Sequence, residues 1–427
     1  MPIAVSLLAS IVNFKIPESS LFFGELSLDG SLRHTRGGLL LALFAKEKGI
    51  KNVFVPRDSV NESAVVRGVN VFGVESLSQI LSHLLKKSEI SPAIYRREDL
   101  DEINIKPDFD MGEILGQEQA KRAMEITSAG GHNILLLGSP GAGKTMLARA
   151  LSGILPPLQE EESLEVTKIY SAAGKIPPGG SIITNCPYRS PHHTISGVGL
   201  IGGGSKPKPG EVSLAHRGVL FLDEFAEYPR SVMEVLRQPM EDGKLTISRV
   251  MTSVDYPARF ILVASANPCP CGYLLHPKKQ CTCSEREIRK YKKRISGPIL
   301  DRIDLHVEVP VVDVKALAED DRAKRFLESS SEIRERVIKA REIQHKRFLA
   351  DNIFTNAEMR NEQIKKHCQL SKEAKQILTQ AAGSFNLSAR AYFKTIKVSR
   401  TIADLANSLN IESSHVAEAI QYRFKQE

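Results

Sequence analysis

The segment Gly138-Ser-Pro-Gly-Ala-Gly-Lys-Thr145 constrains the fold of this chain more than any other part of the sequence. Its spacing is G-x-x-x-x-G-K-[ST], it follows the apolar run 134–137, and it leads into a helical pattern over 146–151. Glycines allow such a loop to turn its backbone N–H groups toward a phosphate, and the helix N-terminus adds partial positive charge. The sequence therefore predicts a strand–loop–helix unit that binds the phosphates of a nucleotide.

Two side chains of this loop have expected chemical roles. Lys144 is expected to reach the β- and γ-phosphates, and the Thr145 hydroxyl is expected to ligate Mg²⁺. A glycine-rich turn that binds nothing is the alternative, and the Lys-Thr pair between a strand and a helix argues against it. The predicted nucleotide-binding residues of the loop are Gly138, Ser139, Pro140, Gly141, Ala142, Gly143, Lys144 and Thr145.

A second apolar run, residues 218–222, ends in the carboxylates Asp223 and Glu224. A continuous apolar run is typical of a strand that is buried on both faces of a parallel sheet. Ligands bind at the carboxyl ends of such strands. We expect Asp223 to hold Mg²⁺ through water and Glu224 to polarise the attacking water, so ATP and Mg²⁺ are the predicted cofactors.

The composition is that of a globular protein, and its charge is compatible with an anionic partner. A chain of 427 residues predicts more than one domain, and 42% hydrophobic with 25% charged residues is ordinary for globular proteins. The net charge of +8 fits nucleic acid as a partner, or only a diffuse positive surface. Residues 2–12 have no basic segment before them, and no apolar run is long enough to span a membrane, so a cytoplasmic protein without a membrane partner is expected.

Four of the six cysteines fall within fifteen residues, which favours a metal site over disulfides. Two C-x-C pairs, Cys269 with Cys271 and Cys281 with Cys283, supply ligands for one tetrahedral Zn²⁺, although reduced free cysteines are the alternative. The basic cluster 290–294 follows directly. It suits a contact to a phosphate backbone or a plain solvated surface.

Residues 113–427 resemble the Mg-chelatase-like AAA+ ATPases. The resemblance is carried by the phosphate loop, the pair His192-His193, the four-cysteine loop and the segment Ser296-Gly-Pro-Ile-Leu-Asp-Arg302. It implies a P-loop AAA+ core, with helices on both faces of a parallel sheet, and a C-terminal helical lid. It also implies a homo-oligomeric ring, as a hexamer, whose ATP hydrolysis drives branch migration of DNA in natural transformation and recombination. The motor subunit of a metal chelatase and a remnant of a Lon-like protease are the alternatives.

The resemblance implies four further site residues. Asn267, after the strand 260–265, matches the sensor-1 position, which orients the attacking water. Arg302 matches the arginine finger that one subunit presents to the next, and Arg390 matches the sensor-2 arginine of the lid. Gln117 matches the stretch that lies over the adenine. For Asn267 a turn before a proline is the alternative, and for Arg390 it is an exposed basic helix face shared with Lys394 and Lys397.

The 78 positions from Thr145 to Asp223 leave room for an insertion that contains the histidine pair. In the related ATPases such loops point into the ring pore and touch DNA, so the candidate phosphate contacts are Arg189, Lys206 and Lys208. Solvated loop charges are the alternative. Metal binding by the histidine pair is disfavoured, because adjacent histidines rarely share one ion.

The N-terminal region predicts a small α/β domain, with helices over 39–48 and 76–85 and strands over 52–55 and 69–72. It resembles the Lon-protease-like domain of the same ATPases through Phe23–Arg33, Gly37-Gly38 and Val53–Pro56. The chain opens at the middle of that pattern, so a truncated domain with an exposed apolar face is expected. Leu40 stands where Lon-like proteases have a catalytic lysine, so protease activity is not expected. The predicted domains are 1–88, a linker 89–112, the core 113–312 and the lid 313–427.

Overall fold

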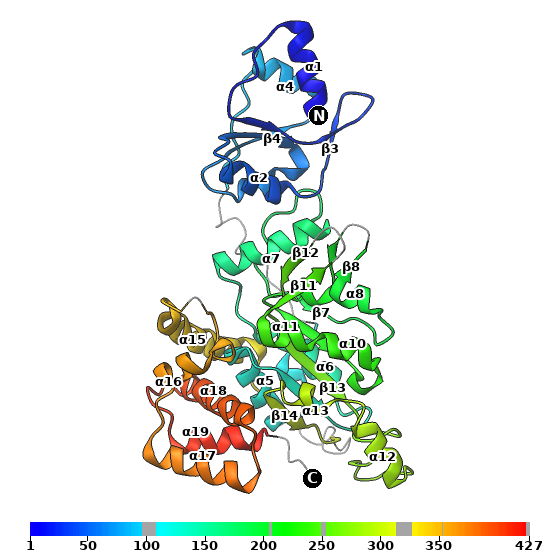
Figure 1. The fold of residues 1–427 in the computed structure, drawn as a ribbon, viewed down its shortest axis with the longest axis vertical. Coiled ribbons are helices and arrows are strands. Elements are labelled where there is room, and N and C mark those ends of the chain that lie inside the picture. The colour runs from blue at the N-terminus through cyan, green and yellow to red at the C-terminus, as the bar shows by residue number, and fades with distance from the viewer. Residues whose placement is uncertain (96–107, 205–206, 249–252, 313–326, 352, 424–427) are drawn as a thin grey trace. The chain divides into compact units, whose positions relative to one another are not determined.

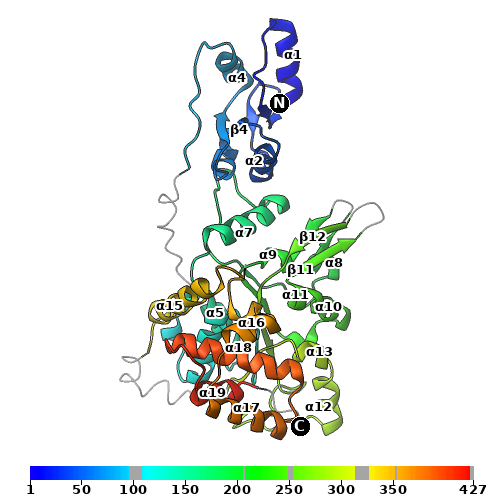
Figure 2. The same ribbon diagram turned by 60° about the vertical axis from the view of Figure 1, so that its left-hand side comes forward.

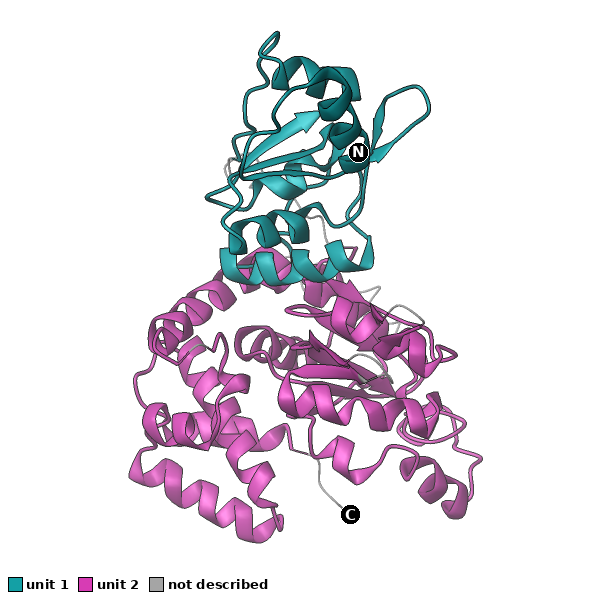
Figure 3. Ribbon diagram, turned by 45° about the horizontal axis from the view of Figure 1, so that its top comes forward, with its two compact units in different colours: residues 1–104, 158–185 teal, residues 105–157, 186–427 magenta. Residues whose placement is uncertain are grey.

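The computed structural model describes residues 1–95, 108–204, 207–248, 253–312, 327–351 and 353–423 (Figure 1). They form two compact units, coloured separately in Figure 3. Unit 1 comprises 1–104 and 158–185, and unit 2 comprises 105–157 and 186–427. None of the described helices combines the length and the apolar character that a membrane crossing requires.

Unit 1 is an α/β unit around a three-stranded parallel sheet of order β1-β4-β5. The strands consist largely of β-branched and aromatic residues, which suit a half-buried pleated surface. Ser76 accepts a hydrogen bond from the backbone N–H of Gln79 and so caps α4, which confirms the predicted helix start. The elements are α1 (Pro2–Val12), β1 (Ser20–Phe22), β2 (Glu25–Leu26), β3 (Leu32–Arg33), α2 (Gly38–Glu47), β4 (Asn52–Pro56), α3 (Val60–Ala64), β5 (Asn70–Val74), α4 (Leu77–Leu84) and α7 (Glu160–Ala173).

Helix α7 lies in the long insertion after the phosphate loop, yet it packs in unit 1. Leu164 packs against the cluster of Leu39, Ala42 and Val66. The Ser171 hydroxyl donates a hydrogen bond to the buried carboxylate of Glu62. The insertion therefore supplies one helix of the N-terminal unit, and the chain returns to unit 2 at residue 186.

Helix α1 leaves part of its apolar surface open. Ile3, Leu7 and Ile11 follow one another at four-residue spacing and are 77%, 59% and 78% exposed. Because residues four apart lie on one helical face, these side chains form an apolar stripe. The exposed apolar face that the sequence predicts for this domain is present.

Unit 2 is built on a five-stranded parallel sheet of order β14-β6-β13-β10-β7. Strand β6 leads into the phosphate loop, β10 ends before the two carboxylates, and β13 lies between them. The fold class predicted from the sequence is confirmed. The strands are β6 (Ile134–Leu137), β7 (Tyr188–Arg189), β10 (Val219–Leu222), β13 (Ile261–Ala266) and β14 (Leu305–Glu308).

Both faces of this sheet are covered by helices. Ile134 and Leu136 belong to one core cluster, with residues of α5, α6, α15 (Ser330–Phe348) and α18 (Ala389–Leu405). Leu135 belongs to a second cluster with residues of α8, α10 and α13. Alternate residues of a strand point to opposite faces, so the continuous apolar run of β6 fills both cores. The core elements are α5 (Glu118–Gly130), α6 (Lys144–Ile154), α8 (Gly197–Ile201), β8 (Gly202–Gly203), β9 (Lys208–Pro209), α9 (Glu211–Leu214), α10 (Arg230–Val235), α11 (Arg237–Asp242), β11 (Lys244–Ser248), β12 (Ser253–Pro257), α12 (Glu285–Lys292) and α13 (Gly297–Leu300).

The C-terminal helices form the lid, with α18 packed among the others (Figure 2). Lys394 of α18 pairs with Asp304, at 2.8 Å between Nζ and Oδ1, and both side chains are nearly buried. Burial alone would raise the pKa of Asp304, but the nearby Lys394 lowers it to about 2. The basic face expected on α18 is therefore largely internal. The lid helices are α15 (Ser330–Phe348), α16 (Asn361–His367), α17 (Lys372–Ser384), α18 (Ala389–Leu405) and α19 (Ser413–Gln421).

Candidate nucleotide-binding site

The phosphate loop runs from the end of β6 to the start of α6. Gly141 and Gly143 have φ angles of 78° and 90°, which only glycine adopts without strain. Gly138 is required for a different reason, because a Cβ there would lie 2.4 Å from the carbonyl oxygen of Val309. The glycines of the motif thus allow the backbone conformation in which the loop connects β6 to the start of α6.

Lys144 lies inside the curve of this loop. Its Nζ donates hydrogen bonds to the carbonyl oxygens of Gly138 at 2.6 Å and Ser139 at 3.0 Å, and to Oδ1 of Asn267 at 3.1 Å. Burial lowers the pKa of Lys144, and the nearby Asp223 and Glu224 oppose that shift. The structure therefore brings the predicted phosphate-binding lysine and the predicted sensor asparagine together.

The two candidate magnesium ligands also meet. The Thr145 hydroxyl donates to Oδ2 of Asp223 at 3.0 Å. The meeting follows from the sheet order, since β6, β13 and β10 are parallel neighbours and their loops leave the same edge. A hydroxyl and a carboxylate are hard oxygen donors, the kind that Mg²⁺ prefers, so both residues fit this ion. When bound there, Mg²⁺ would neutralise charge on the β- and γ-phosphate oxygens.

Ser265 also belongs to this group of side chains, although the motifs in the sequence do not point to it. Its buried hydroxyl donates to Oδ1 of Asp223 and accepts from the backbone N–H of Glu224 at 3.2 Å. Glu224 has φ of 50°, which is uncommon for a residue other than glycine. Ser265 therefore holds both the side chain of one acid and the backbone of the next. Its one sequence signal is a hydroxyl in the otherwise apolar strand β13.

Glu224 has a partner from the insertion. Its Oε2 lies 3.3 Å from Nδ1 of His193. The rings of His192 and His193 are 4.1 Å apart, and His192 pairs with the Thr194 hydroxyl at 2.9 Å. No acidic residue lies near the histidine pair along the chain. The structure supplies one, because the segment after β7 runs beside the end of β10.

Gln117 lies at the base of the phosphate loop and is buried. Its amide Nε2 donates to the carbonyl oxygens of Ala142 at 3.3 Å and Pro310 at 2.6 Å. These bonds tie the segment before α5 to the loop and to the end of β14. An adenine contact by this residue remains a prediction.

The two candidate arginines lie together, at one acidic side chain. Arg302 follows α13, and Arg390 is in the first turn of α18. Each guanidinium donates a terminal N–H to the carboxylate of Glu241, one to each oxygen. Arg302 also donates to the carbonyl oxygen of Pro298 at 2.7 Å. The hydrogen bond from Arg302 lowers the pKa of Glu241, so the carboxylate is charged.

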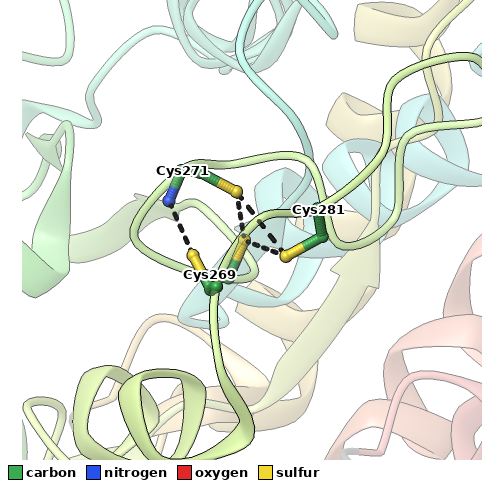
Figure 4. A group of neighbouring side chains, drawn as sticks. Cys269, Cys271 and Cys281 are labelled. Carbon is green, nitrogen blue, oxygen red and sulfur yellow. Dashed lines mark hydrogen bonds between the residues drawn. The ribbon is translucent and has the colours of Figure 1, made fainter.

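The four clustered cysteines converge in the loop after β13. Figure 4 shows the sulfurs of Cys269, Cys271 and Cys281 pointing toward one another. Their mutual distances are 3.4, 3.6 and 3.7 Å, and the four ligand atoms, with Cys283, all lie within 4.8 Å of one another. Tetrahedral Zn²⁺ with bonds of about 2.3 Å places sulfurs about 3.8 Å apart. The donor set and its spacing therefore fit Zn²⁺.

The cysteine loop packs on the phosphate loop. A Cβ at Gly272 would lie 2.5 Å from Cδ of Pro140, so only glycine allows this approach. Backbone N–H groups of Tyr273 and Thr282 donate to the sulfur of Cys271 and lower its pKa to about 6, which favours the thiolate that a metal binds. The cluster is therefore connected to the nucleotide site by direct contact.

The candidate DNA contacts differ in their surroundings. Arg189 is half-buried on β7, and its Nε lies 2.5 Å from Oε2 of Glu211. Lys208 on β9 is exposed, and Lys206 lies outside the described residues. In the basic cluster after the cysteine loop, the exposed lysines are Lys290, Lys292 and Lys293, whereas Arg294 pairs with Glu227 at 2.6 Å.

Three family models match the chain, and together they cover most of it. The model "Magnesium chelatase, subunit ChlI" matches residues 110–317. The model "Magnesium chelatase, subunit ChlI C-terminal" matches residues 327–423, and "Subunit ChlI of Mg-chelatase" matches residues 1–59.

Individual relatives agree with these models. The chain is 38% identical over 438 residues to the competence protein ComM of Haemophilus influenzae, which covers 99% of this chain and 82% of that protein. It is 39% identical over 431 residues to the uncharacterized protein YifB of Escherichia coli, covering 99% and 81%. The chain is 28% identical over 268 residues to the magnesium-chelatase 38 kDa subunit of Rhodobacter capsulatus. This alignment covers 56% of this chain and 70% of that protein.

Proposed function

Because this chain belongs to the Mg-chelatase-like family of AAA+ proteins and is of the ComM and YifB type, we propose that it is an ATP-hydrolysing motor that acts on DNA as a homo-oligomeric ring, with branch migration as its activity. The observation that carries the ATPase part is the meeting of Lys144, Asn267, Thr145, Asp223 and Glu224 at one sheet edge. In this proposal Lys144 binds the β- and γ-phosphates, Thr145 and Asp223 hold Mg²⁺, and Glu224 and Asn267 orient the attacking water.

The position of the two arginines supports the proposed ring. Arg302 and Arg390 are bonded to Glu241 rather than to the phosphate loop of their own chain. Phosphoryl transfer needs positive charge on the transferring group, and an arginine supplied by a neighbour is one known source. We infer that a neighbouring subunit receives these guanidiniums, which makes the ring, expected as a hexamer, a condition for turnover.

DNA is the proposed partner on grounds of charge and relatedness. The net charge is +8, and the exposed lysines of the cysteine-loop region lie close together in the sequence at 290, 292 and 293. Lysines of this kind bind phosphates without reading sequence. One relative of nearly full length carries the name competence protein. We propose that the protein acts in the cytoplasm.

Forked or four-way-junction DNA is expected to stimulate ATP hydrolysis by the assembled full chain. The stimulation should weaken between about 50 and 200 mM salt, because phosphate contacts release counterions. A variant with Lys290→Glu and Lys293→Glu should lose DNA affinity and part of the salt dependence. Lys372→Glu with Lys375→Glu, two exposed lysines of α17, is the matched control.

Steady-state ATPase rates, measured with and without each DNA, report the stimulation. The native mass reports whether the chain is assembled. Hydrolysis that no DNA structure stimulates would remove the DNA role and leave the ATPase. A metal-chelatase motor is the alternative, and it would instead respond to partner chains and a porphyrin. The identity to the chelatase subunit covers 56% of this chain, against 99% for ComM, which favours the DNA motor.

We also propose that Cys269, Cys271, Cys281 and Cys283 hold one structural Zn²⁺. The metal would fix the loop that packs on Pro140 and that follows Asn267. Structural zinc contributes on the order of 10 kcal/mol to the folding of small sites. Its removal is therefore expected to loosen the phosphate loop.

Metal analysis of the purified chain should find about one Zn²⁺ per subunit. Replacing Cys271 and Cys283 with serine is expected to abolish the bound zinc, lower the melting temperature and weaken ATP binding. Cys186→Ser, which changes a cysteine outside the cluster, is the control and should leave zinc content unchanged. Full zinc content in the double variant, or none in the unaltered protein, contradicts the site.

A further inference from the structure

Glu241 joins the two candidate arginines into one group. It is in α11, whereas Arg302 follows α13 and Arg390 begins α18 of the lid. The arginines lie 61 and 149 positions from Glu241 in the sequence, and each donates to a different oxygen of its carboxylate. Three separate elements of the fold therefore meet at one acidic side chain.

Charge explains why an acid is needed there. Two guanidiniums that approach a single point repel each other, and a carboxylate between them compensates that repulsion. The side chains of Glu241 and Arg390 are 46% and 42% exposed, whereas that of Arg302 is 13% exposed, so the cluster is open to solvent on the side of Glu241 and Arg390. The hydrogen bond from Arg302 keeps the pKa of this carboxyl below its usual value, so it stays ionised.

The contacts to Glu241 leave some N–H donors of both arginines without a partner in the cluster. A guanidinium has five N–H donors, and each contact to Glu241 uses one terminal nitrogen. Arg302 donates from its second terminal nitrogen to the carbonyl oxygen of Pro298, and its Nε is buried, so its remaining donors are the second N–H of each terminal nitrogen. Donors therefore remain for a further anion while Glu241 stays bound.

We propose that Glu241 is a positioning residue, which holds Arg302 and Arg390 side by side as one paired guanidinium site for the terminal phosphate of a nucleotide on the neighbouring subunit. This inference rests on the proposed ATPase function. A phosphate, like a carboxylate, has several oxygens that can accept hydrogen bonds from two guanidiniums. The two arginines already lie close enough together to donate to one such group. In this proposal Glu241 acts through the two arginines and not on the nucleotide itself.

Glu241→Ala is expected to lower kcat of the assembled chain by about 100-fold, as misplaced catalytic groups do, while the Kd for ATP stays within about twofold of the unaltered value. Glu241→Gln, which keeps one acceptor oxygen and loses the charge, should give a smaller loss. Asp242→Asn removes a neighbouring exposed carboxylate and is the control for charge alone. Its kcat should be unchanged.

Rings that contain two kinds of variant subunit distinguish a positioning role of Glu241 from a purely structural one. A Glu241→Ala subunit keeps its own Lys144, Asp223 and Glu224, so it should regain turnover beside Glu224→Gln subunits that supply well-placed arginines. In a chain that already lacks both arginines, Glu241→Ala should cause no further loss. Absence of rescue in mixed rings of normal melting temperature overturns the proposal, as does unchanged or raised kcat. An unaltered chain without ATPase activity would instead refute the proposed function.

Discussion

Replacing Arg302 with alanine is expected to lower the rate of ATP hydrolysis by about 10³–10⁵-fold and to leave ATP binding nearly unchanged. The reason is that Arg302 is bonded to Glu241 and Pro298 rather than to the phosphate loop of its own chain, so its proposed contribution is to the nucleotide of a neighbour. Steady-state hydrolysis and the binding of a fluorescent ATP analogue measure the two effects separately.

Mixed assemblies test whether the arginine acts across the subunit boundary. Glu224→Gln subunits should bind ATP without hydrolysing it, because the amide cannot accept the proton of the attacking water. When they are mixed with Arg302→Ala subunits, part of the activity should return, since each variant supplies what the other lacks. Arg289→Ala, at an exposed arginine of α12, is the control. No return at any mixing ratio would rule out the action in trans.

Replacing Lys144 with alanine is expected to weaken ATP binding by about 100-fold or more. Each hydrogen bond from a charged group contributes about 1.5–3 kcal/mol, and Lys144 is expected to bond two phosphates. Its Nζ is already directed into the loop by the carbonyl oxygens of Gly138 and Ser139 and by Asn267, so little ordering is needed when phosphate arrives.

Titration calorimetry with ATP and Mg²⁺ measures this loss. Lys372→Ala, an exposed lysine at the start of α17, is the matched control and should bind ATP as the unaltered chain does. The melting temperature in the absence of nucleotide reports whether the loop itself has been disturbed. Unchanged affinity in a folded Lys144→Ala chain would contradict the nucleotide site.

The contiguous parts of the proposed site can be recognised in the sequence. The phosphate loop and the pair Asp223-Glu224 need neighbouring residues on a strand end, and such local patterns are visible in a single chain. The strand–loop–helix unit, the fold class and the four-cysteine cluster all follow from short-range spacing. Their geometry is set mainly by backbone constraints, such as the positive φ of Gly141 and Gly143.

Other assignments required the tertiary structure. Spacing on α18 places Arg390, Lys394 and Lys397 on one face, but it does not say what covers that face. Asp304 pairs with Lys394, and the carbonyl oxygen of Ala357 accepts from Lys397, so both lysines point inward. The placement of α7 in unit 1 could not be predicted from the sequence either, because its packing partners precede it by about a hundred residues or more.

What the sequence determined by itself is a P-loop α/β core, together with the residues that we propose bind a triphosphate. The partners of those groups were decided only by the fold: Ser265 beside Asp223, His193 beside Glu224, and Glu241 between Arg302 and Arg390. Each of these contacts joins segments at least 31 residues apart in the sequence, as with His193 and Glu224. Such contacts depend on strand order and on how the lid packs, and no local pattern of residues encodes either.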